Sequence, residues 1–524
     1  MSTIVFAAHK DAKFAKENGT VLDPSIPPIS LHWKLPRDMA DPSLAFLSRA
    51  RRRSSSGMAA ATSSIKRKRE EAGKALSTIL KGRSSHREGE VSPLRSASDV
   101  PPGVGSSGGS APRASSSVSQ ASAVSIQESV QDLMSIVRTP AFSAADKYRV
   151  LDARDKLLKR QRVREQDLSK AKAMLGVCPD MCPEKERYGR QEQRNLSLFE
   201  MSSNSSAYEV DHMRAVKAYA RSSADQEEPL PFELRPGKVL RMTMDHLIMN
   251  VAGECNEANV SDWYLFMWDR TRSIRKDITQ QQLSDLTAIS LVEQCARFHI
   301  HCSAALCEED VSVFDPKIND ENLTKCLKTL EYMYDDLAKD SKGHAPHEAE
   351  FRAYDALLNL NTGDTLRKIQ TFRPETFRPE VRSSAEIEFA VSIFLALNNR
   401  HYVKFFRLAA SAPYLSSCLL LRYHTQARTT ALEVISRSYA IGNKTSELPL
   451  SEIQSWLGFS SSEEARQFVR NFGLEATGDG RTVLIGRALF TAPEEKILER
   501  NSDFLVRRKL QGRSISECYS EFYC

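Results

Sequence analysis

Two cysteines in one short turn are the first residues whose types and spacing could do chemistry. Cys178 and Cys182 are separated by three residues, and Pro179 and Pro183 follow them directly. A structural zinc site takes four ligands, usually from two such pairs, and no second pair follows. Because each proline fixes its own φ angle, the turn is stiff. The pattern favours a rigid structural turn and keeps a metal site as the alternative.

A second group of soft ligands lies in a segment with helical periodicity. Cys295, His299 and Cys302 fall at i, i+4 and i+7, which places them on one helix face, while His301 points elsewhere. The same face continues an apolar stripe, so the pattern favours a packed helix over a metal site.

Catalytic motifs are missing from the sequence. It contains no Gly-x-x-x-x-Gly-Lys phosphate loop and no His-Glu-x-x-His pair. We therefore expect a binding protein rather than an enzyme, with no catalytic residues, cofactor or metal.

Charge is distributed unevenly along the chain. The formal net charge is +6, and most of the positive excess lies in residues 49–100. The remainder is nearly neutral, so nucleic-acid binding there would need a local patch. One such patch is the basic stripe from Arg154 to Arg164, which would contact phosphates, an acidic partner or only solvent.

An aromatic and basic stretch is a further candidate. At helical spacing, its aromatic residues are expected in a core and its cations along an exposed edge. The aromatic residues are Trp263, Tyr264, Phe266 and Trp268, and the cations are Arg270, Arg272, Arg275 and Lys276.

Residues 1–124 are rich in Ser, Gly, Pro and Arg and are predicted to form a disordered tail. Two basic clusters in it have the spacing of a two-part nuclear-import signal, with a solvated basic linker as the alternative. They are Arg51, Arg52 and Arg53, then Lys66, Arg67, Lys68 and Arg69. No signal peptide or membrane-spanning apolar run is recognisable, so we expect a soluble intracellular protein.

The elements that would position these residues are mainly helical. Residues 125–237 are predicted to form an N-terminal arm, with a helix from Ser143 to Leu175 that stops at Gly176. Residues 238–443 show helical periodicity with short connections, which predicts stacked helix pairs, an α-solenoid. Residues 496–524 are assigned to a C-terminal tail.

Residues 444–495 are predicted to form a winged helix. Helix Leu450–Leu457 and the Gly458 turn precede a capping box and a second helix with apolar residues at i, i+3, i+4 and i+7. A hairpin of Leu474–Ala476 with Arg481–Ile485 follows. Such a unit binds nucleic acid by charge or docks a protein. The candidate nucleic-acid contacts are Arg466, Arg470, Arg481 and Arg487.

Several long motifs stand in one order along the chain: Lys147–Lys156, Gly176–Tyr188, Tyr219–Pro236, Thr271–Gln281 and Cys295–Cys302. Together they resemble the family of suppressor-of-actin and germinal-centre-associated nuclear proteins (GANP), over about residues 126 to 510. The turn residues that carry the signature are Cys178, Pro179, Asp180, Met181, Cys182, Pro183, Glu184 and Arg187.

The resemblance implies a helical repeat ending in a winged helix, similar to PCI modules. It also implies a nuclear scaffold of the TREX-2 type that supports mRNA export at the nuclear pore. Its expected partners are a second PCI-domain subunit, a small acidic peptide subunit, pore components, and mRNA or DNA held by the four arginines. The expected location is the nucleus at the pore, with the cytoplasm as a further location.

Two departures from the larger relatives bear on these expectations. This sequence has no Phe-Gly repeats before the matching region, and it stops before their centrin-binding helix and acetyltransferase-like segment. The resemblance therefore leaves open how the pore is reached, and it leaves centrin binding and acetyl transfer open as well. There are two alternatives to the export scaffold. The first is a centrosome- or spindle-associated role, and the second is a purely structural PCI scaffold without nucleic-acid binding.

Overall fold

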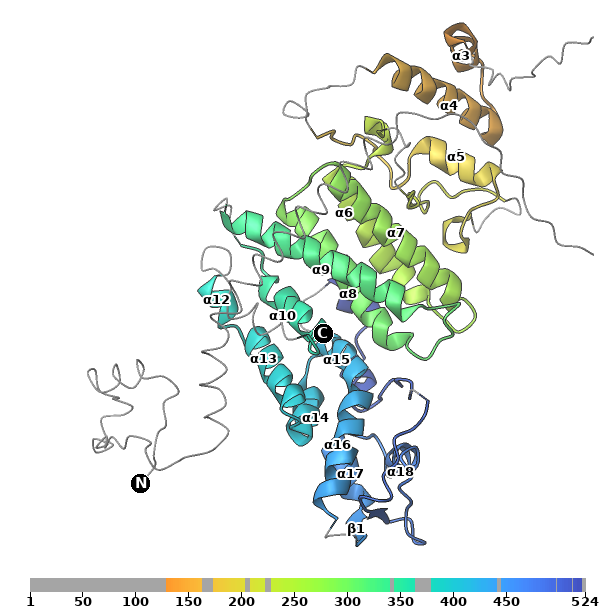
Figure 1. Ribbon diagram of the computed structural model, residues 1–524. Coiled ribbons are helices and arrows are strands. Elements are labelled where there is room, and N and C mark those ends of the chain that lie inside the picture. The colour runs from red at the N-terminus through yellow and green to blue at the C-terminus, as the bar shows by residue number, and fades with distance from the viewer. Residues whose placement is uncertain are drawn as a thin grey trace, which may run out of the picture. The chain divides into compact units, whose positions relative to one another are not determined.

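The computed structural model describes residues 129–162, 173–202, 208–221, 228–339, 344–362, 378–440, 444–495, 497–510 and 512–520. The fold is mainly helical, as the sequence predicts, with one two-stranded sheet among the described residues (Figure 1). None of the described helices has the length and apolarity needed to cross a membrane.

The signature arm comprises the described residues from 129 to 236. Its elements are α3 (Val130–Val137), α4 (Ala144–Gln161), α5 (Glu184–Glu192), η1 (Leu198–Glu200) and η2 (Pro231–Glu233).

The predicted helix from Ser143 to Leu175 is wrong in its C-terminal part. Ser143 and Asp146 form the expected capping box, but α4 ends at Gln161 and Arg162 is extended. Residues 163–172 lie outside the described residues, and residues 173–178 are not helical. Like charges one turn apart along this stripe weaken the helix, and Arg162 leaves it to pair with Glu228 at 2.6 Å.

Gly176 is therefore not a helix cap. Its backbone N–H donates to Gln281 Oε1 at 2.7 Å, and a Cβ added here would overlap the Leu234 carbonyl oxygen. A glycine is required because two backbone segments touch, which is a use of glycine that the local sequence pattern does not reveal.

The repeat domain comprises the described residues from 237 to 440. Its longer helices are α6 (Gly237–His246), α7 (Val260–Gln280), α8 (Leu286–Ala305), α9 (Pro316–Lys339), α10 (Glu348–Leu358), α13 (Ala385–Asn398), α14 (Tyr402–Ser411), α15 (Tyr414–Leu420) and α16 (His424–Ser438). Shorter turns are η3 (Leu247–Val251), η4 (Ala252–Glu254), α12 (Pro379–Arg382) and η5 (Leu421–Tyr423).

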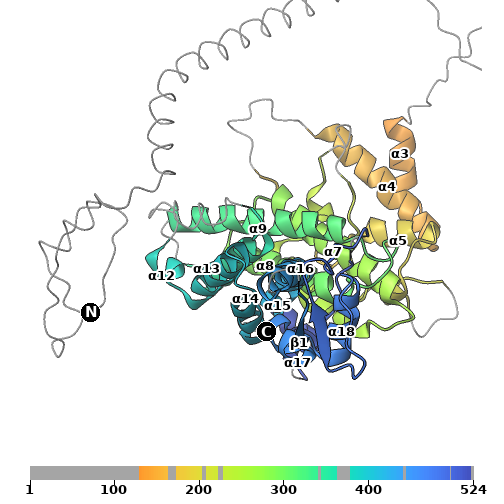
Figure 2. The same ribbon diagram turned by 60° about the horizontal axis from the view of Figure 1, so that its bottom comes forward.

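Helix α8 is the centre of the core. It packs against α6, α7, α9 and α15 (Figure 2), and nearly all of its residues from Ala288 to Ala304 are buried. Because α8 is buried on all sides, its polar side chains are buried too and need partners: Glu293 accepts from Tyr334 OH at 2.7 Å, and Arg297 pairs with Glu350 at 2.8 Å.

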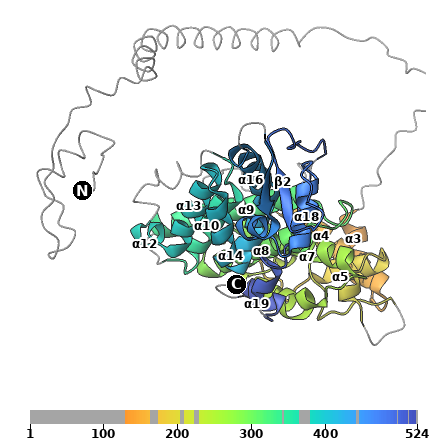
Figure 3. The same cartoon turned by 90° about the horizontal axis from the view of Figure 1, so that it is seen from below.

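The wing unit, residues 444–495, contains β1 (Ser446–Pro449), α17 (Leu450–Leu457), α18 (Ser462–Arg470) and β2 (Thr482–Ile485). Both predicted helices and the left-handed Gly458 between them are present. Ser461 rather than Ser460 caps α18, by accepting the Glu464 N–H at 3.1 Å. Figure 3 shows α18 and β2 beside α16.

The small sheet differs in part from the predicted hairpin. Ala476 pairs with Val483 as an isolated bridge, and the Leu484 N–H donates to the Glu475 carbonyl at 3.0 Å. The main partner of β2 is β1, antiparallel, from Ser446 opposite Ile485 to Pro449 opposite Thr482. The sequence did not predict β1, because a short segment that contains proline has the composition of a loop.

The C-terminal segment, residues 497–510 and 512–520, was assigned to a tail, but it returns to the repeat domain. It contains η6 (Arg507–Leu510) and α19 (Ile515–Ser520), which packs on α8 and η3. Lys509 Nζ donates to the carbonyls of Ala409 and Ala412 and to Ser417 Oγ, at 2.6–2.9 Å. Burial lowers the pKa of Lys509 to about 8.

Two further contacts anchor α19. The Tyr519 ring lies edge-on to Phe298 and His301 of α8. Ser516 Oγ donates to the Ile248 carbonyl at 2.7 Å, in the π-helical turn η3, where the backbone hydrogen-bond ladder is shifted.

Candidate binding surfaces

The two cysteines of the signature turn are packed inside the arm. Cys178 Sγ donates to the Asp180 carbonyl at 3.3 Å, and Cys182 Sγ accepts from Arg190 Nη2 at 3.3 Å. Burial raises the pKa of both thiols, so both remain protonated at neutral pH, whereas a metal ligand must be a thiolate. Their contacts are those of structural side chains.

The rest of the turn fixes α5 against its neighbours. Pro183 occupies the N-cap position of α5, and Glu184 is in its first turn. Arg187 pairs with Asp180 at 2.7 Å and donates to the His212 carbonyl. The Met181 carbonyl accepts the Lys217 N–H at 3.0 Å. The signature sequence therefore encodes an interlocked turn rather than a set of solvent-facing groups.

A buried ion-pair network joins the arm to α7. Glu200 is fully buried and accepts from Arg190 Nη1 at 2.7 Å, Arg270 Nη2 at 2.9 Å and the Val216 N–H at 2.9 Å. Burial alone would raise the pKa of Glu200, but Arg270 and Arg190 outweigh it and hold the pKa below its ordinary value.

A second buried carboxylate extends this junction. Asp277 accepts from Arg235 Nε at 2.8 Å and from Lys217 Nζ at 2.7 Å. The expectation that Arg270 lies on an exposed edge is wrong, because it is only 7% exposed and pairs with Glu200. Local spacing could not reveal this pair, since Glu200 and Arg270 are 70 residues apart.

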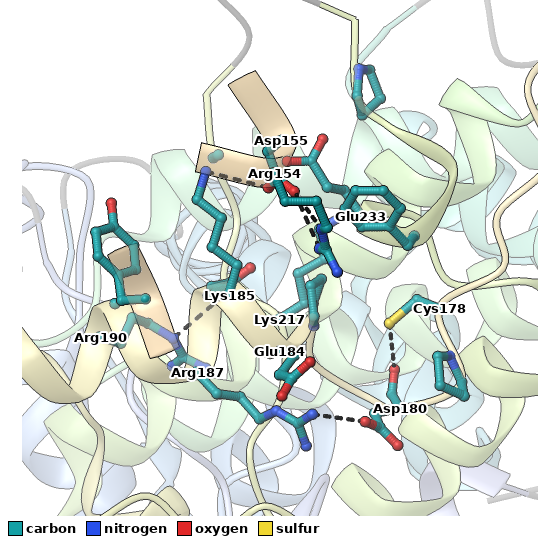
Figure 4. Close-up of a pocket in the computed structure, with 18 of the residues that line it drawn as sticks. Arg154, Asp155, Cys178, Asp180, Glu184, Lys185, Arg187, Arg190, Lys217 and Glu233 are labelled. Carbon is teal, nitrogen blue, oxygen red and sulfur yellow. Dashed lines mark hydrogen bonds and ion pairs between the residues drawn. The ribbon is translucent and has the colours of Figure 1, made fainter. Parts of the chain in front are cut away.

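A mixed-charge cleft of about 1020 Å³ lies between α4, the signature turn and α5. Figure 4 shows Arg154, Asp155 and Lys185 on one side of it and Asp180 and Arg187 on another. Lys185 pairs with Asp155 at 3.3 Å, and Arg154 pairs with Asp155 at 3.1 Å. The basic stripe of α4 is thus partly neutralised by neighbouring acids, which weakens it as a phosphate surface.

The second group of soft ligands is also packed. His299 Nδ1 lies 2.8 Å from Asn319 Oδ1, and His301 Nδ1 lies 2.9 Å from Tyr414 OH. Cys295 and Cys302 are fully buried in α8. The expected packed helix is confirmed, and His301 has a different environment from His299, as the spacing predicted.

The four candidate arginines of the wing unit fall into two kinds. Arg470, Arg481 and Arg487 are exposed. Arg466 is half-buried, pairs with Glu463 and donates to the Gly480 carbonyl at 3.0 Å. Arg466 therefore supports the turn after α18, and the other three remain as solvent-facing cations.

The wing unit is fixed to α16 by Arg428, which sequence patterns did not single out. Its guanidinium donates to the carbonyls of Leu457 and Gly458 at 3.1 and 2.9 Å and lies 3.9 Å from the Phe459 ring centroid. These carbonyls end α17, so a side chain of the repeat domain caps a helix of the wing unit.

The predicted import clusters, Arg51–Arg53 and Lys66–Arg69, lie outside the described residues.

The chain is similar to several larger proteins. It is 44% identical to Protein xmas of Drosophila melanogaster over 75% of this chain and 18% of that protein. It is 33% identical to SAC3 family protein 1 of Schizosaccharomyces pombe, over 67% of this chain and 35% of that protein. With SAC3 family protein B of Arabidopsis thaliana it shares 35% identity, over 55% of this chain and 17% of that protein.

The chain thus spans about a third or less of the length of these relatives. The model of the SAC3/GANP family matches residues 181–478, which is more than half of the sequence. The match includes the arm from Met181 onward, the repeat domain and most of the wing unit. The match agrees with the resemblance that the signature turn and the later motifs indicated. The chain belongs to the SAC3/GANP family.

Proposed function

We propose that this protein is a nuclear scaffold of the TREX-2 type that supports export of mRNA through the nuclear pore. In this role the repeat domain and the wing unit hold a second PCI-domain subunit, braced by a small acidic peptide subunit, and the wing unit binds RNA. Membership of the SAC3/GANP family supports this proposal, together with a helical repeat that ends in a helix–turn–helix unit with a small sheet.

The observation that carries the nucleic-acid part is the position of Arg470, Arg481 and Arg487. The two helices and the sheet of the wing unit follow the order of a winged helix, and these exposed cations lie on α18 and beside β2. Cations on a rigid frame contact phosphates without base specificity, and salt weakens such binding steeply.

Phe468 and Phe472 are not available to a partner, because both are buried in the wing unit. The aromatic surface that remains is formed by Trp456 of α17 and Tyr439, whose ring centroids are 6.1 Å apart. Tyr439 is 41% exposed. Half-buried aromatic rings are typical anchors at protein interfaces, so we assign the PCI partner to this face.

The RNA assignment is tested by reversing Arg470 and Arg481 to Glu together. We expect the affinity for a single-stranded RNA, measured by fluorescence anisotropy, to fall at least about tenfold and the salt slope to shrink by about 1.4 for two lost phosphate contacts. Arg382→Glu with Arg437→Glu is the matched control, because both are exposed helix arginines outside the wing unit. Equal affinities of the two double variants would contradict RNA binding by the wing unit.

The partner assignment is tested by purification of the tagged chain from nuclear extract. A stoichiometric PCI-domain protein with a small acidic companion is expected, and Trp456→Ala should remove both while RNA binding persists. Co-purification of centrosomal or proteasomal proteins instead would support the alternative roles. For the import signal, a variant that lacks residues 49–70 should lose nuclear accumulation, and full nuclear retention would count against it.

A further inference from the structure

One solvent-facing side of α7 carries an arginine between two aromatic rings. Trp268, Arg272 and Lys276 follow each other at i, i+4 and i+8, which places them on one helix face. None of the three is fully buried. We call Tyr219, Arg272 and Trp268 the aromatic–arginine stack. Helix α7, which carries Trp268 and Arg272, is labelled in Figure 1.

The stack is defined by short ring contacts. The Arg272 guanidinium carbon lies 4.0 Å from the Tyr219 ring centroid and 4.4 Å from the Trp268 ring centroid. Both distances are well within the range of favourable cation–π contacts. Tyr219 comes from the arm and Trp268 from α7, so the stack exists only when these two parts of the fold are joined.

Arg272 differs from its neighbours because no carboxylate pairs with it among the described residues. Arg270 pairs with Glu200 and Asp269, and Arg275 donates to Asn322 Oδ1 at 2.9 Å. Asp269, the nearest acid in sequence, accepts the Tyr219 N–H at 2.9 Å as well as pairing with Arg270. The rings hold the Arg272 plane in place, and none of the described residues accepts a hydrogen bond from its guanidinium.

Lys276 adds a second cation beside the stack. Its Nζ lies 5.8 Å from the Tyr219 ring centroid and donates to the Ala220 carbonyl at 2.6 Å. Lys276, Ala220 and Lys217 also line the cleft of the signature turn. Lys276 therefore connects the stack to the mixed-charge cleft of the arm.

We propose that the aromatic–arginine stack is a second contact site for single-stranded RNA, with Arg272 and Lys276 on a backbone phosphate. A planar guanidinium donates two parallel hydrogen bonds to a phosphate, and its fixed orientation reduces the entropy lost on binding. Cations interleaved with aromatic rings are the surface that single-stranded nucleic acids use. On the α4 stripe, Arg154 also lies over a ring, 4.3 Å from the Phe232 centroid, but its guanidinium already pairs with Asp155.

This inference rests on the proposed RNA role of the chain but not on the wing unit. RNA held at both surfaces would contact the two ends of the described fold, so each site contributes its own part of the affinity. The two contributions are separable by mutation, because Arg272 is on α7 and Arg470 is on α18.

The test measures the affinity of the full chain for an oligouridine of about 16 nucleotides, which covers the upper range of single-stranded site sizes. Arg272→Gln should lower the affinity about tenfold and reduce the salt slope by about 0.7, as expected for one lost phosphate contact. Arg382→Gln on α12 is the control, an exposed arginine that should change neither value. Lys276→Gln should give a smaller loss in the same direction.

A second measurement locates the bound RNA on the wild-type protein, so it does not depend on whether a variant folds. Ultraviolet cross-linking of the same oligouridine should attach nucleotide to peptides that contain Tyr219 or Trp268 in the wild type, and Arg272→Gln should weaken this signal. Wild-type binding with no effect of Arg272→Gln and no such cross-link would overturn the inference and leave the wing-unit proposal standing. If Arg272→Gln instead weakened binding of a short poly-glutamate peptide and left RNA binding unchanged, the stack would be assigned to an acidic protein partner. If the wild type bound no RNA, both proposals would fall together.

Discussion

At the junction of the signature arm with α7, buried ion pairs accompany apolar contacts such as Phe199 on Phe266. At the junction of the wing unit with α14 and α16, aromatic rings surround one buried guanidinium, that of Arg428. Glu200 holds two guanidinium groups at the first junction. At the second, Phe406 lies under Gly458 and Arg428 covers Phe459. A buried ion pair adds little to the net free energy of folding, but removal of one partner is strongly destabilising because the other charge stays buried and unpaired. Apolar packing lowers the free energy of the folded state without depending on one specific partner. Ion pairs therefore contribute more to positioning the arm, whereas the wing unit is positioned by aromatic packing around the hydrogen bonds of Arg428.

The largest effect is expected for Glu200→Gln, which removes the fully buried carboxylate that Arg190 and Arg270 share. Among the described carboxylates, the two guanidinium groups then keep only the partly exposed Glu186 and Asp269. We expect a loss of about 3–5 kcal/mol in the free energy of unfolding and rapid proteolysis of the arm with the wing unit intact. Glu433→Gln removes an exposed pair with Arg437 on α16 and should change stability by less than about 1 kcal/mol. Similar denaturation curves for the two variants would show that the charged junction is not what holds the arm.

Arg428→Leu probes the other junction. The Leu457 and Gly458 carbonyls would lose their donors, at a cost of about 1–3 kcal/mol. Hydrogen exchange should accelerate in α17 and α18 while the arm keeps its protection. Arg437→Leu on the same helix is the control, and equal exchange rates in both variants would rule out Arg428 as the link.

A paired glycine substitution compares the backbone packing of the two regions. Gly176→Ala would push a methyl group into the backbone at Leu234, and such overpacking costs about 1–3 kcal/mol. Gly478→Ala in the wing unit meets no atom within 4 Å and should leave the melting temperature unchanged. An unchanged melting temperature for Gly176→Ala would mean that the turn moves freely relative to Leu234.

The smallest effect is a difference in acid sensitivity. Burial, with Arg428 and Lys509 nearby, lowers the pKa of His424 well below its ordinary value, so below about pH 6.5 only the unfolded chain takes up this proton. Stability at the base of the wing unit should then fall by about 1.4 kcal/mol per pH unit. The pKa of Glu200 is also lowered, but its contribution is lost only when the pH falls below the ordinary glutamate range, about 4.3.

Burial and Arg187 also lower the pKa of His212 in the arm, but the pKa of the fully buried His424 is lowered further. Hydrogen exchange between about pH 7 and pH 5, corrected for intrinsic rates, should therefore show the wing unit loosening more than the arm. His424→Phe removes the titrating group among the rings of Phe405 and Phe406 and should abolish this slope. A slope that persists in that variant would assign the acid sensitivity to other groups.

Sequence patterns predicted the elements whose information is local. The apolar face of α18 follows a 3.6-residue period, and the turn at Gly458 has the left-handed backbone that favours glycine. The packed character of α8 was also predictable, because its Cys and His residues share a face with an apolar stripe at helical spacing. These features need only neighbouring residues, so one sequence is sufficient to find them.

The sites depend on distant partners, and there the predictions were incomplete. The basic and aromatic stretch of α7 was recognised from the sequence. In the structure, however, Arg270 forms a buried ion pair and Arg272 is stacked between two rings. The difference comes from Glu200 and Tyr219, which lie far from α7 in the sequence. Arg466 had the spacing of a surface cation, but its guanidinium donates to the Gly480 carbonyl and is half-buried. Neither the composition nor the hydrophobic periodicity of a sequence indicates which distant residues will pair.

The contact between α19 and α8 has a consequence for synthesis on the ribosome. Ser516 bonds to Ile248, 268 residues earlier, and Tyr519 completes the packing around Phe298. While residues near 516 are still in the ribosomal exit tunnel, α8 is long since translated but has one side uncovered. The nascent repeat domain must therefore wait, with an apolar helix accessible to chaperones, until almost the whole described chain has emerged.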